Sequence, residues 1–285
     1  MTSFALALVL LSAVAHAGWN YLTKKSSDTL VFSWCFTALA SVLYLPFLLT
    51  IVLRTSVPPA GWLFVAGTMV LHIVYFHLLN SAYTHGDLSL VYPVARGTGI
   101  ALIPIGGSLL LGETVSLPAA LAIAAILFGV LAVNRGASWR TLTAAFAEKG
   151  SRFALATGLL IAGYTLWDKQ ALSLVPPLVL IYASFFGQAL TATPLVLRRP
   201  IALRKEIGER KMAIVAAAVF APLAYLLVLY ALTFSRVSYV GPAREISIVV
   251  GAALGTLALG EPYGRGRLLG SAVIVAGVLA LALAP

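Results

Sequence analysis

Residues 89–113 read SLVYPVARGTGIALIPIGGSLLLGE, and residues 237–261 read VSYVGPAREISIVVGAALGTLALGE. Aligned at an offset of 148 residues, each stretch is an apolar run that contains one arginine, Arg96 or Arg244, and ends in Leu-Gly-Glu. An ionised side chain at the centre of a bilayer costs roughly 2.5–3.5 kcal/mol on insertion scales. Because this cost occurs twice at matching positions, the sequence predicts an internal repeat and a functional role for the arginine pair.

The composition excludes a water-soluble globule. Of the 285 residues, 61% are hydrophobic and 10% are charged, whereas soluble domains carry about 25% charged residues. Apolar runs of about 20 residues, the length that crosses a bilayer as a helix, recur along the chain. They lack the two-residue alternation of a membrane β-barrel. We therefore expect an all-α polytopic membrane protein.

Turn-forming and charged residues divide the chain into ten predicted transmembrane helices and two halves. The first half covers residues 1–134, a basic loop covers 135–152, and the second half covers 153–285. Since each half has an odd number of spans, the second half must be inverted relative to the first, as in many secondary transporters. The predicted spans are 4–23, 30–53, 62–85, 88–111, 116–134, 153–172, 177–197, 211–233, 237–259 and 267–284.

Loop charge predicts the orientation. Most of the 19 lysines and arginines lie in loops that follow odd-numbered spans. The positive-inside rule places those loops in the cytoplasm and both termini outside. The net charge of +10 therefore reflects topology and contact with anionic membrane lipids, and we expect no nucleic-acid partner.

With ten predicted spans in two inverted halves, and with Leu111-Gly112-Glu113 and Leu259-Gly260-Glu261 ending the fourth and ninth spans, the chain resembles the drug/metabolite transporter superfamily. Within it the likeness is to the EamA-type permeases, with Pro93 and Pro242 upstream of the signatures. The resemblance implies secondary transport of small metabolites by alternating access, and most characterised relatives are exporters. Many members lack an arginine in these two helices, so substrates of cation or neutral-solute members are not carried over.

Arg96 and Arg244 are the predicted substrate-binding cations. At 1.5 Å per residue, Arg96 lies ~12 Å and Arg244 ~10 Å along its helix. Because the halves are inverted, the two side chains enter from opposite faces and straddle the midplane. Guanidinium groups bind carboxylate or phosphate with two parallel hydrogen bonds. The alternative is that each arginine has a structural partner, with Glu245 the neighbour of Arg244.

Polar and aromatic residues on the first and sixth predicted helices would complete the site. The two helices align at an offset of 145 residues, so that Trp19 matches Tyr164. Such a stripe lines a cavity or joins helices by hydrogen bonds, and the sequence leaves both roles open. The candidate substrate-binding residues are Arg96, Arg244, Trp19, Asn20, His16, Tyr92, Tyr164, Trp167 and Tyr225.

Motifs for other chemistry are missing from the sequence. It has no Gly-rich Lys-Ser/Thr phosphate loop, no His-Glu-x-x-His and no Gly-x-Ser-x-Gly. His72 and His77 are five residues apart and have no metal-ligand spacing. We therefore expect no enzyme, no catalytic residue, no metal and no cofactor. Glu113 and Glu261 are expected to cap the N-terminus of the helix that follows each of them.

Together these features predict a multi-pass inner-membrane secondary transporter. Its substrate would be a small organic anion or zwitterion with a carboxylate, phosphate or phosphonate group. The alternatives are an exporter of neutral or aromatic amino acids, a flippase for lipid headgroups, and a purely structural membrane partner. The sequence leaves open the substrate's identity, the direction of transport, coupling to protons or another ion, and whether the protein forms a homodimer.

Overall fold

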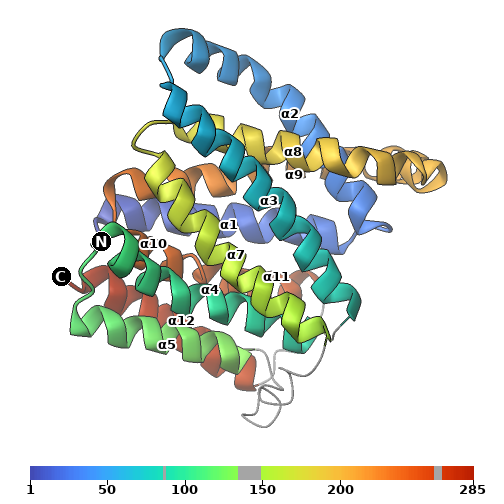
Figure 1. Ribbon diagram of the computed structural model, residues 1–285. Helices are drawn as coiled ribbons and strands as arrows, with labels where there is room; N and C mark the ends of the chain where they lie inside the picture. Colours follow the sequence, from blue (N-terminus) through green and yellow to red (C-terminus); the bar gives the residue numbers. More distant parts are fainter. Residues whose placement is uncertain (86–87, 134–148, 260–264) are drawn as a thin grey trace.

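The computed structural model describes residues 1–85, 88–133, 149–259 and 265–285, and every regular element in this part of the chain is an α-helix (Figure 1). Their bounds agree with the predicted spans within a few residues, except in the ninth span and at the start of α9. The helices are α1 (Ser3–Lys24), α2 (Thr29–Arg54), α3 (Pro59–His85), α4 (Leu88–Leu111), α5 (Leu117–Val133), α7 (Lys149–Ala171), α8 (Pro177–Leu197), α9 (Pro200–Phe234), α10 (Val237–Ala243), α11 (Ile246–Leu259) and α12 (Arg265–Leu283).

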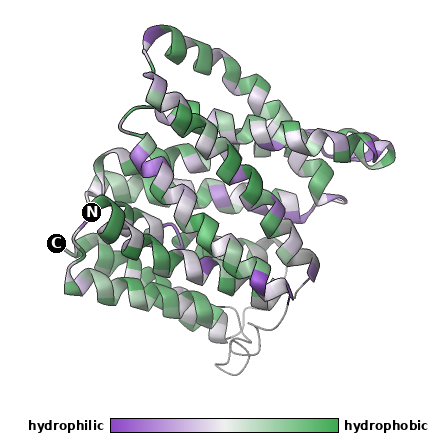
Figure 2. Cartoon of the chain, in the orientation of Figure 1, coloured by the Kyte–Doolittle hydropathy of each residue, from purple (hydrophilic) through white to green (hydrophobic). Residues whose placement is uncertain are grey.

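By length and hydropathy, seven segments of the described chain can each cross a membrane. They comprise α1, α2, α3, α4, α8, α9 and the α10–α11 unit, while α5 and α12 supply shorter apolar helices. Most of each ribbon is hydrophobic, with hydrophilic residues gathered mainly at the helix ends and at a few positions inside the bundle (Figure 2). The protein is therefore a multi-pass helical membrane protein, and the count of ten spans stays a prediction.

Two predicted boundaries differ from the structure. The expected basic loop 135–152 ends earlier, since α7 begins at Lys149, and residues 134–148 lie outside the described part. The basic segment after α8 is helical as well, because α9 begins at Pro200 and runs to Phe234 with a kink at Arg210. A proline at the first helical position suits this start, since its missing N–H has no partner there in any case.

Packing between helices is symmetric when the two halves are exchanged. α1 packs on α9 as α7 packs on α3, and α1 packs on α11 as α7 packs on α4. Counterparts also pair with each other, α2 with α8 and α5 with α12. This pattern is expected of two halves related by a two-fold axis. The chain termini meet on one side, where the Met1 amino group lies 3.4 Å from the Ala282 carbonyl oxygen (Figure 1).

α5 and α12 lie side by side at the edge of the bundle (Figure 1). Their backbones come close at glycines. A Cβ added to Gly129 would lie 2.9 Å from the Gly270 carbonyl oxygen, and one added to Gly277 would lie 3.1 Å from that of Ala122. Small residues permit such contact between membrane helices. This pair therefore forms a wall beside the helices that surround the centre.

The Leu-Gly-Glu signature joins the two halves. Gly112 has a positive φ of 66°, a conformation that glycine adopts without the Cβ clash. The turn places the Glu113 carboxylate on the first residues of α10, where it accepts hydrogen bonds from Val237 N (2.7 Å), Ser238 N (2.9 Å) and Ser238 Oγ (2.6 Å). The expectation that Glu113 caps the following helix is wrong, because the helix start nearest in space belongs to the other half. Glu261 lies outside the described residues.

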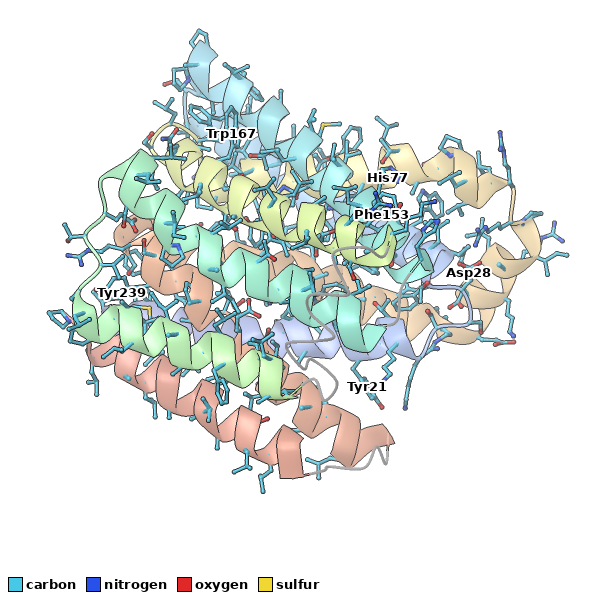
Figure 3. The ribbon with its side chains drawn as sticks, turned by 60° about the horizontal axis from the view of Figure 1, so that its bottom comes forward. Tyr21, Asp28, His77, Phe153, Trp167 and Tyr239 are labelled. Atoms are coloured by element: carbon cyan, nitrogen blue, oxygen red, sulfur yellow. The ribbon has the colours of Figure 1, made fainter. Side chains whose placement is uncertain are left out.

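At the opposite side, the α1–α2 turn is bound to the start of α9 by hydrogen bonds and an ion pair. Asp28 caps α2 by accepting from Leu30 N and Val31 N, and it pairs with Arg199 at 2.8 Å. Glu206, 1% exposed, accepts from Ser27 N and Asp28 N. The α1–α2 turn therefore holds the basic start of α9 against the bundle, a placement seen near Asp28 in Figure 3.

Candidate substrate-binding site

The ninth span is interrupted at the site. The sequence predicts one helix over 237–259, whereas the structure has α10 and α11 separated by a turn at Arg244 and Glu245. Pro242 has no N–H and cannot complete the helical ladder. At the turn, Glu245 N donates to Pro242 O (3.1 Å) and Ile248 N to Glu245 O (2.9 Å). Interrupted helices near the midplane form the substrate sites of many secondary transporters.

A cavity of about 130 Å³ lies at this interruption, between the two halves of the chain. Helices from both halves contribute its wall, and most of the lining is aromatic, basic or small. The lining residues are Ser12, His16, Trp19, Phe36, His72, Tyr75, Arg96, Tyr164, Ile181, Ser184, Phe185, Gln188, Ala221, Ala224, Tyr225, Val228, Arg244 and Ser247.

Arg96 is held by an acid from the other half. Its Nε donates to Glu245 Oε2 at 2.9 Å, and its Nη2 lies 2.8 Å from Oε1, which makes a two-pronged ion pair. The two side chains are 11% and 6% exposed. The sequence shows no acid near Arg96, and it gave Glu245 as a partner of Arg244 only under the alternative that each arginine has a structural partner. That alternative holds for Arg96. Its partner is Glu245 because adjacent residues point ~100° apart on a helix and Glu245 faces α4.

Arg244 has different surroundings. Its guanidinium carbon lies 5.3 Å from the centre of the Tyr225 ring, a cation–π contact. In the described part of the chain no carboxylate lies within ion-pair distance of it and no side-chain hydrogen bond forms. The side chain is only partly buried and lines the cavity. Arg244 therefore presents hydrogen-bond donors to whatever occupies the cavity.

A buried aspartate is hydrogen-bonded to Tyr225. Asp168, on α7, is 0% exposed and accepts from Thr68 Oγ1 (2.5 Å) and from the Tyr225 hydroxyl (2.7 Å). His72 Nδ1 lies 2.9 Å from Thr68 O, and its ring centre lies 4.4 Å from that of Tyr164. Sequence reasoning did not connect Asp168 with the site, and it considered His72 only as a metal ligand, which its spacing excluded. Only the packing of α3, α7 and α9 brings these groups together.

The structure brings six of the predicted residues to the cavity wall: Arg96, Arg244, Trp19, His16, Tyr164 and Tyr225. Trp19 and Tyr164 match in the sequence repeat, as do the two arginines. The side chain of Tyr92 lies outside the described residues. The residues that sequence reasoning missed include Gln188 and Ser247, which carry no signal beyond being isolated polar residues in apolar runs.

Asn20 and Trp167 lie elsewhere, so their expected place in the cavity wall is corrected. Asn20 is exposed, and its amide donates to His16 O within the same helix. Trp167 donates from Nε1 to Phe64 O and lies against Gly67, between α7 and α3 (Figure 3). Asn20 follows the lining residue Trp19 by one residue, a turn of ~100° around α1. Trp167 is only ~60° from the lining residue Tyr164 around α7, but its ring packs against α3.

No group of three metal-ligating side chains occurs among the described residues. The cavity instead combines one unpaired cation, one buried ion pair, hydroxyl groups and aromatic rings. Such a site can bind a small molecule with an anionic group and an apolar or polar remainder.

Comparisons with known proteins place both halves among transporters. Residues 148–283 match the model of the EamA-like transporter family, and residues 32–126 match that of the Small Multidrug Resistance proteins. Of 28 solved chains that match, one crystal structure superposes with a TM-score of 0.73 over 99% of this chain and 98% of its own, at 16% identity. That identity supports the fold alone. No curated protein sequence matches the chain.

Proposed function

Because the chain belongs to the EamA-type permeases of the drug/metabolite transporter superfamily, we propose that it carries a small organic anion or zwitterion across the membrane by alternating access. The ligand's carboxylate, phosphate or phosphonate group binds Arg244. Trp19, Tyr164 and Tyr225 enclose the remainder of the ligand from both halves.

This proposal rests on one observation: Arg244 has no acidic partner among the described residues. A guanidinium inside a bundle is expensive unless another group neutralises it, and the described residues supply only the face of an aromatic ring. Its matching residue Arg96, by contrast, already has a carboxylate. An anionic ligand would neutralise Arg244 as Glu245 neutralises Arg96. Guanidinium geometry suits two-pronged binding of carboxylate or phosphate.

The size of the cavity limits the ligand. A volume of about 130 Å³ is close to the ~150 Å³ engineered cavity that holds one benzene molecule. The ligand in this conformation is therefore a compact metabolite. A second pocket beside the first, at Ala40 and Tyr44, has about 10 Å³, which is room for about one water. This gives no support to the flippase alternative, since an acyl chain needs a far larger groove.

An exporter of neutral amino acids stays the alternative within transport. An amino-acid carboxylate would also bind Arg244, but its ammonium group needs an acceptor. Glu245 is already held by Arg96, and Asp168 lies behind Tyr225. The arrangement therefore favours a ligand whose net charge is negative.

Thermal unfolding of purified protein with acetate, lactate, phosphate or methylphosphonate tests the proposal. A ligand at 100 times its Kd stabilises by about 2.7 kcal/mol, so we expect a clear rise in Tm with at least one anion and none with matched neutral amides. Arg244→Gln should abolish that rise and leave the ligand-free Tm level or higher. The exposed Arg54→Gln is the matched control. A response retained in Arg244→Gln, or a response to none of the anions, would overturn the proposal.

A further inference from the structure

Asp168 has no ion-pair partner among the described residues. Its side chain is fully buried, and both oxygens accept hydrogen bonds from neutral hydroxyls, Thr68 on one side and Tyr225 on the other. No lysine, arginine or histidine lies within ion-pair distance of it in the ranges that the structure describes. Burial penalises the charge of a carboxylate. Because only neutral donors surround Asp168, its ionised form is only weakly favoured over its protonated form.

Tyr225 connects Asp168 to the charged side chain of Arg244. The Tyr225 hydroxyl donates to Asp168 Oδ2 at 2.7 Å, and the face of the same ring carries Arg244 at 5.3 Å. The titratable and charged groups that face Asp168 are His72 from α3, Tyr225 from α9 and Arg244 from the α10–α11 turn. On its own helix, Tyr164 packs against His72 and Tyr225 with ring centres 4.4 and 6.0 Å away.

We propose that Asp168 binds the proton that drives this transporter, and that it couples that proton to the anion at Arg244 as a symport. This inference rests on the proposed function, since it takes Arg244 as the anion-binding group. When Asp168 is ionised, its charge offsets that of Arg244 and opposes an incoming anion. When Asp168 is protonated, the Arg244 charge is left for the anion. Binding free energies are reciprocal, so the bound anion favours the proton by the same factor.

The hydroxyl partners suit a residue that changes its protonation state in place. A hydroxyl can donate to a carboxylate and can accept from a carboxylic acid. Thr68 and Tyr225 can therefore satisfy Asp168 in both forms by rotating their O–H bonds. Reversal of the Tyr225 hydroxyl also changes the polarity next to the ring that carries Arg244. An inward proton gradient would then drive uptake of the anion.

Glu245 is the other acid at the cavity, and its geometry favours a fixed charge. Arg96 holds it with two contacts of 2.9 and 2.8 Å, and a guanidinium does not lose its proton in proteins. Protonation of Glu245 would strand Arg96. Glu245→Gln is therefore the matched control for Asp168→Asn, because it removes a buried carboxyl from the same cavity.

Infrared difference spectra of the purified protein at stepped pH test the inference without a ligand. Acidification should produce the carbonyl stretch of a protonated carboxyl group. That band should be lost in Asp168→Asn and kept in Glu245→Gln. Arg244→Gln removes the cation that is linked to Asp168 and should shift the pH midpoint of this band upward. The exposed Arg54→Gln should leave the midpoint unchanged. If Asp168→Asn fails to fold, Tyr225→Phe removes one donor to the ionised form and should also shift the midpoint upward.

The outcomes separate the two proposals. A carboxyl band that persists in Asp168→Asn, or one indifferent to Arg244→Gln and Tyr225→Phe, overturns the proton site. If anions stabilise the protein through Arg244 but Asp168 shows no band, this inference fails and the proposed function stands. If the band depends on Arg244 but no anion in the panel raises the Tm, the proposed function fails and the proton site linked to Arg244 stands.

Discussion

Arg96 and Arg244 occupy matching positions in the repeat, yet their partners differ. At the same offset of 148 residues, Glu245 corresponds to Gly97, so the first half offers Arg244 no equivalent acid. Asp168 likewise corresponds to Thr23 at the offset of the first and sixth spans. Both acids of the site therefore belong to the second half, and this asymmetry leaves one arginine paired and the other open to the cavity.

The Arg96–Glu245 pair can be tested by unfolding free energies. Removal of one partner leaves the other charge buried, so Arg96→Met and Glu245→Leu should each destabilise the protein by about 3–5 kcal/mol. Replacement of both by apolar residues, Arg96→Met with Glu245→Leu, should be neutral or stabilising. Thermal or denaturant unfolding of the four proteins in the cycle measures the coupling. If both single variants are as stable as the parent, the pair is not a structural contact.

Asp28 provides a pH-dependent contact outside the spans. Partial burial raises the pKa of its carboxyl, but hydrogen bonds from Val31 N and Arg199 lower it more, and the net pKa lies below its usual value. A depressed pKa means that the stabilisation is present above the unfolded-state pKa and is lost as pH falls through the folded-state pKa.

Asp28→Asn isolates this charge, because asparagine caps a helix as well as aspartate does. We expect it to cost at most about 1 kcal/mol at neutral pH, as for other exposed ion pairs, and nothing in acid below the folded-state pKa. Asp28→Ala should cost a further ~1 kcal/mol at every pH because the cap is lost. The measurement is unfolding free energy against pH. A constant difference between wild type and Asp28→Asn would contradict the assignment.

At the scale of elements, the turn after α4 controls the start of α10. Gly112→Ala should destabilise by about 1–2 kcal/mol, since a Cβ is disfavoured at positive φ. Glu113→Ala leaves the N–H groups of Val237 and Ser238 without their acceptor and should cost about 1–3 kcal/mol. Glu113→Gln should recover part of that loss, because its amide oxygen can still accept. Unfolding midpoints of the three variants give the order, and an unstable Gln variant beside a stable Ala variant would refute the cap.

At the scale of the whole molecule, the two termini share one side, where Met1 meets Ala282. Loop charge predicts that this side lies outside the cell. A C-terminal reporter active only in the periplasm or outside should therefore work, and one that needs the cytoplasm should be silent. The start of α9, with its basic residues, should be reached by polar reagents only from the cytoplasm. The opposite pattern would reverse the orientation and leave the fold unchanged.

Several features were determined by the sequence alone. Length and hydropathy specify membrane helices because the bilayer has a fixed thickness and leaves backbone groups no other partner. The repeat put Trp19 and Tyr164, like the two arginines, at equivalent positions, and all four line one cavity, since equivalent positions in two related halves face the same centre. These features depend on the spacing of residues along a helix and on their depth in the membrane, and both can be read from the sequence of a single helix.

The pairing of charges was decided only by the tertiary structure. Arg96 meets Glu245 149 residues away, Asp168 meets Thr68 100 residues away, and Glu113 caps a helix in the other half. An ion pair or a cap depends on angles and distances of a few ångströms between elements, and sequence spacing does not encode them across a bundle. For the same reason Trp167 and Asn20 face away from the cavity, although each lies within three residues of a side chain that lines it.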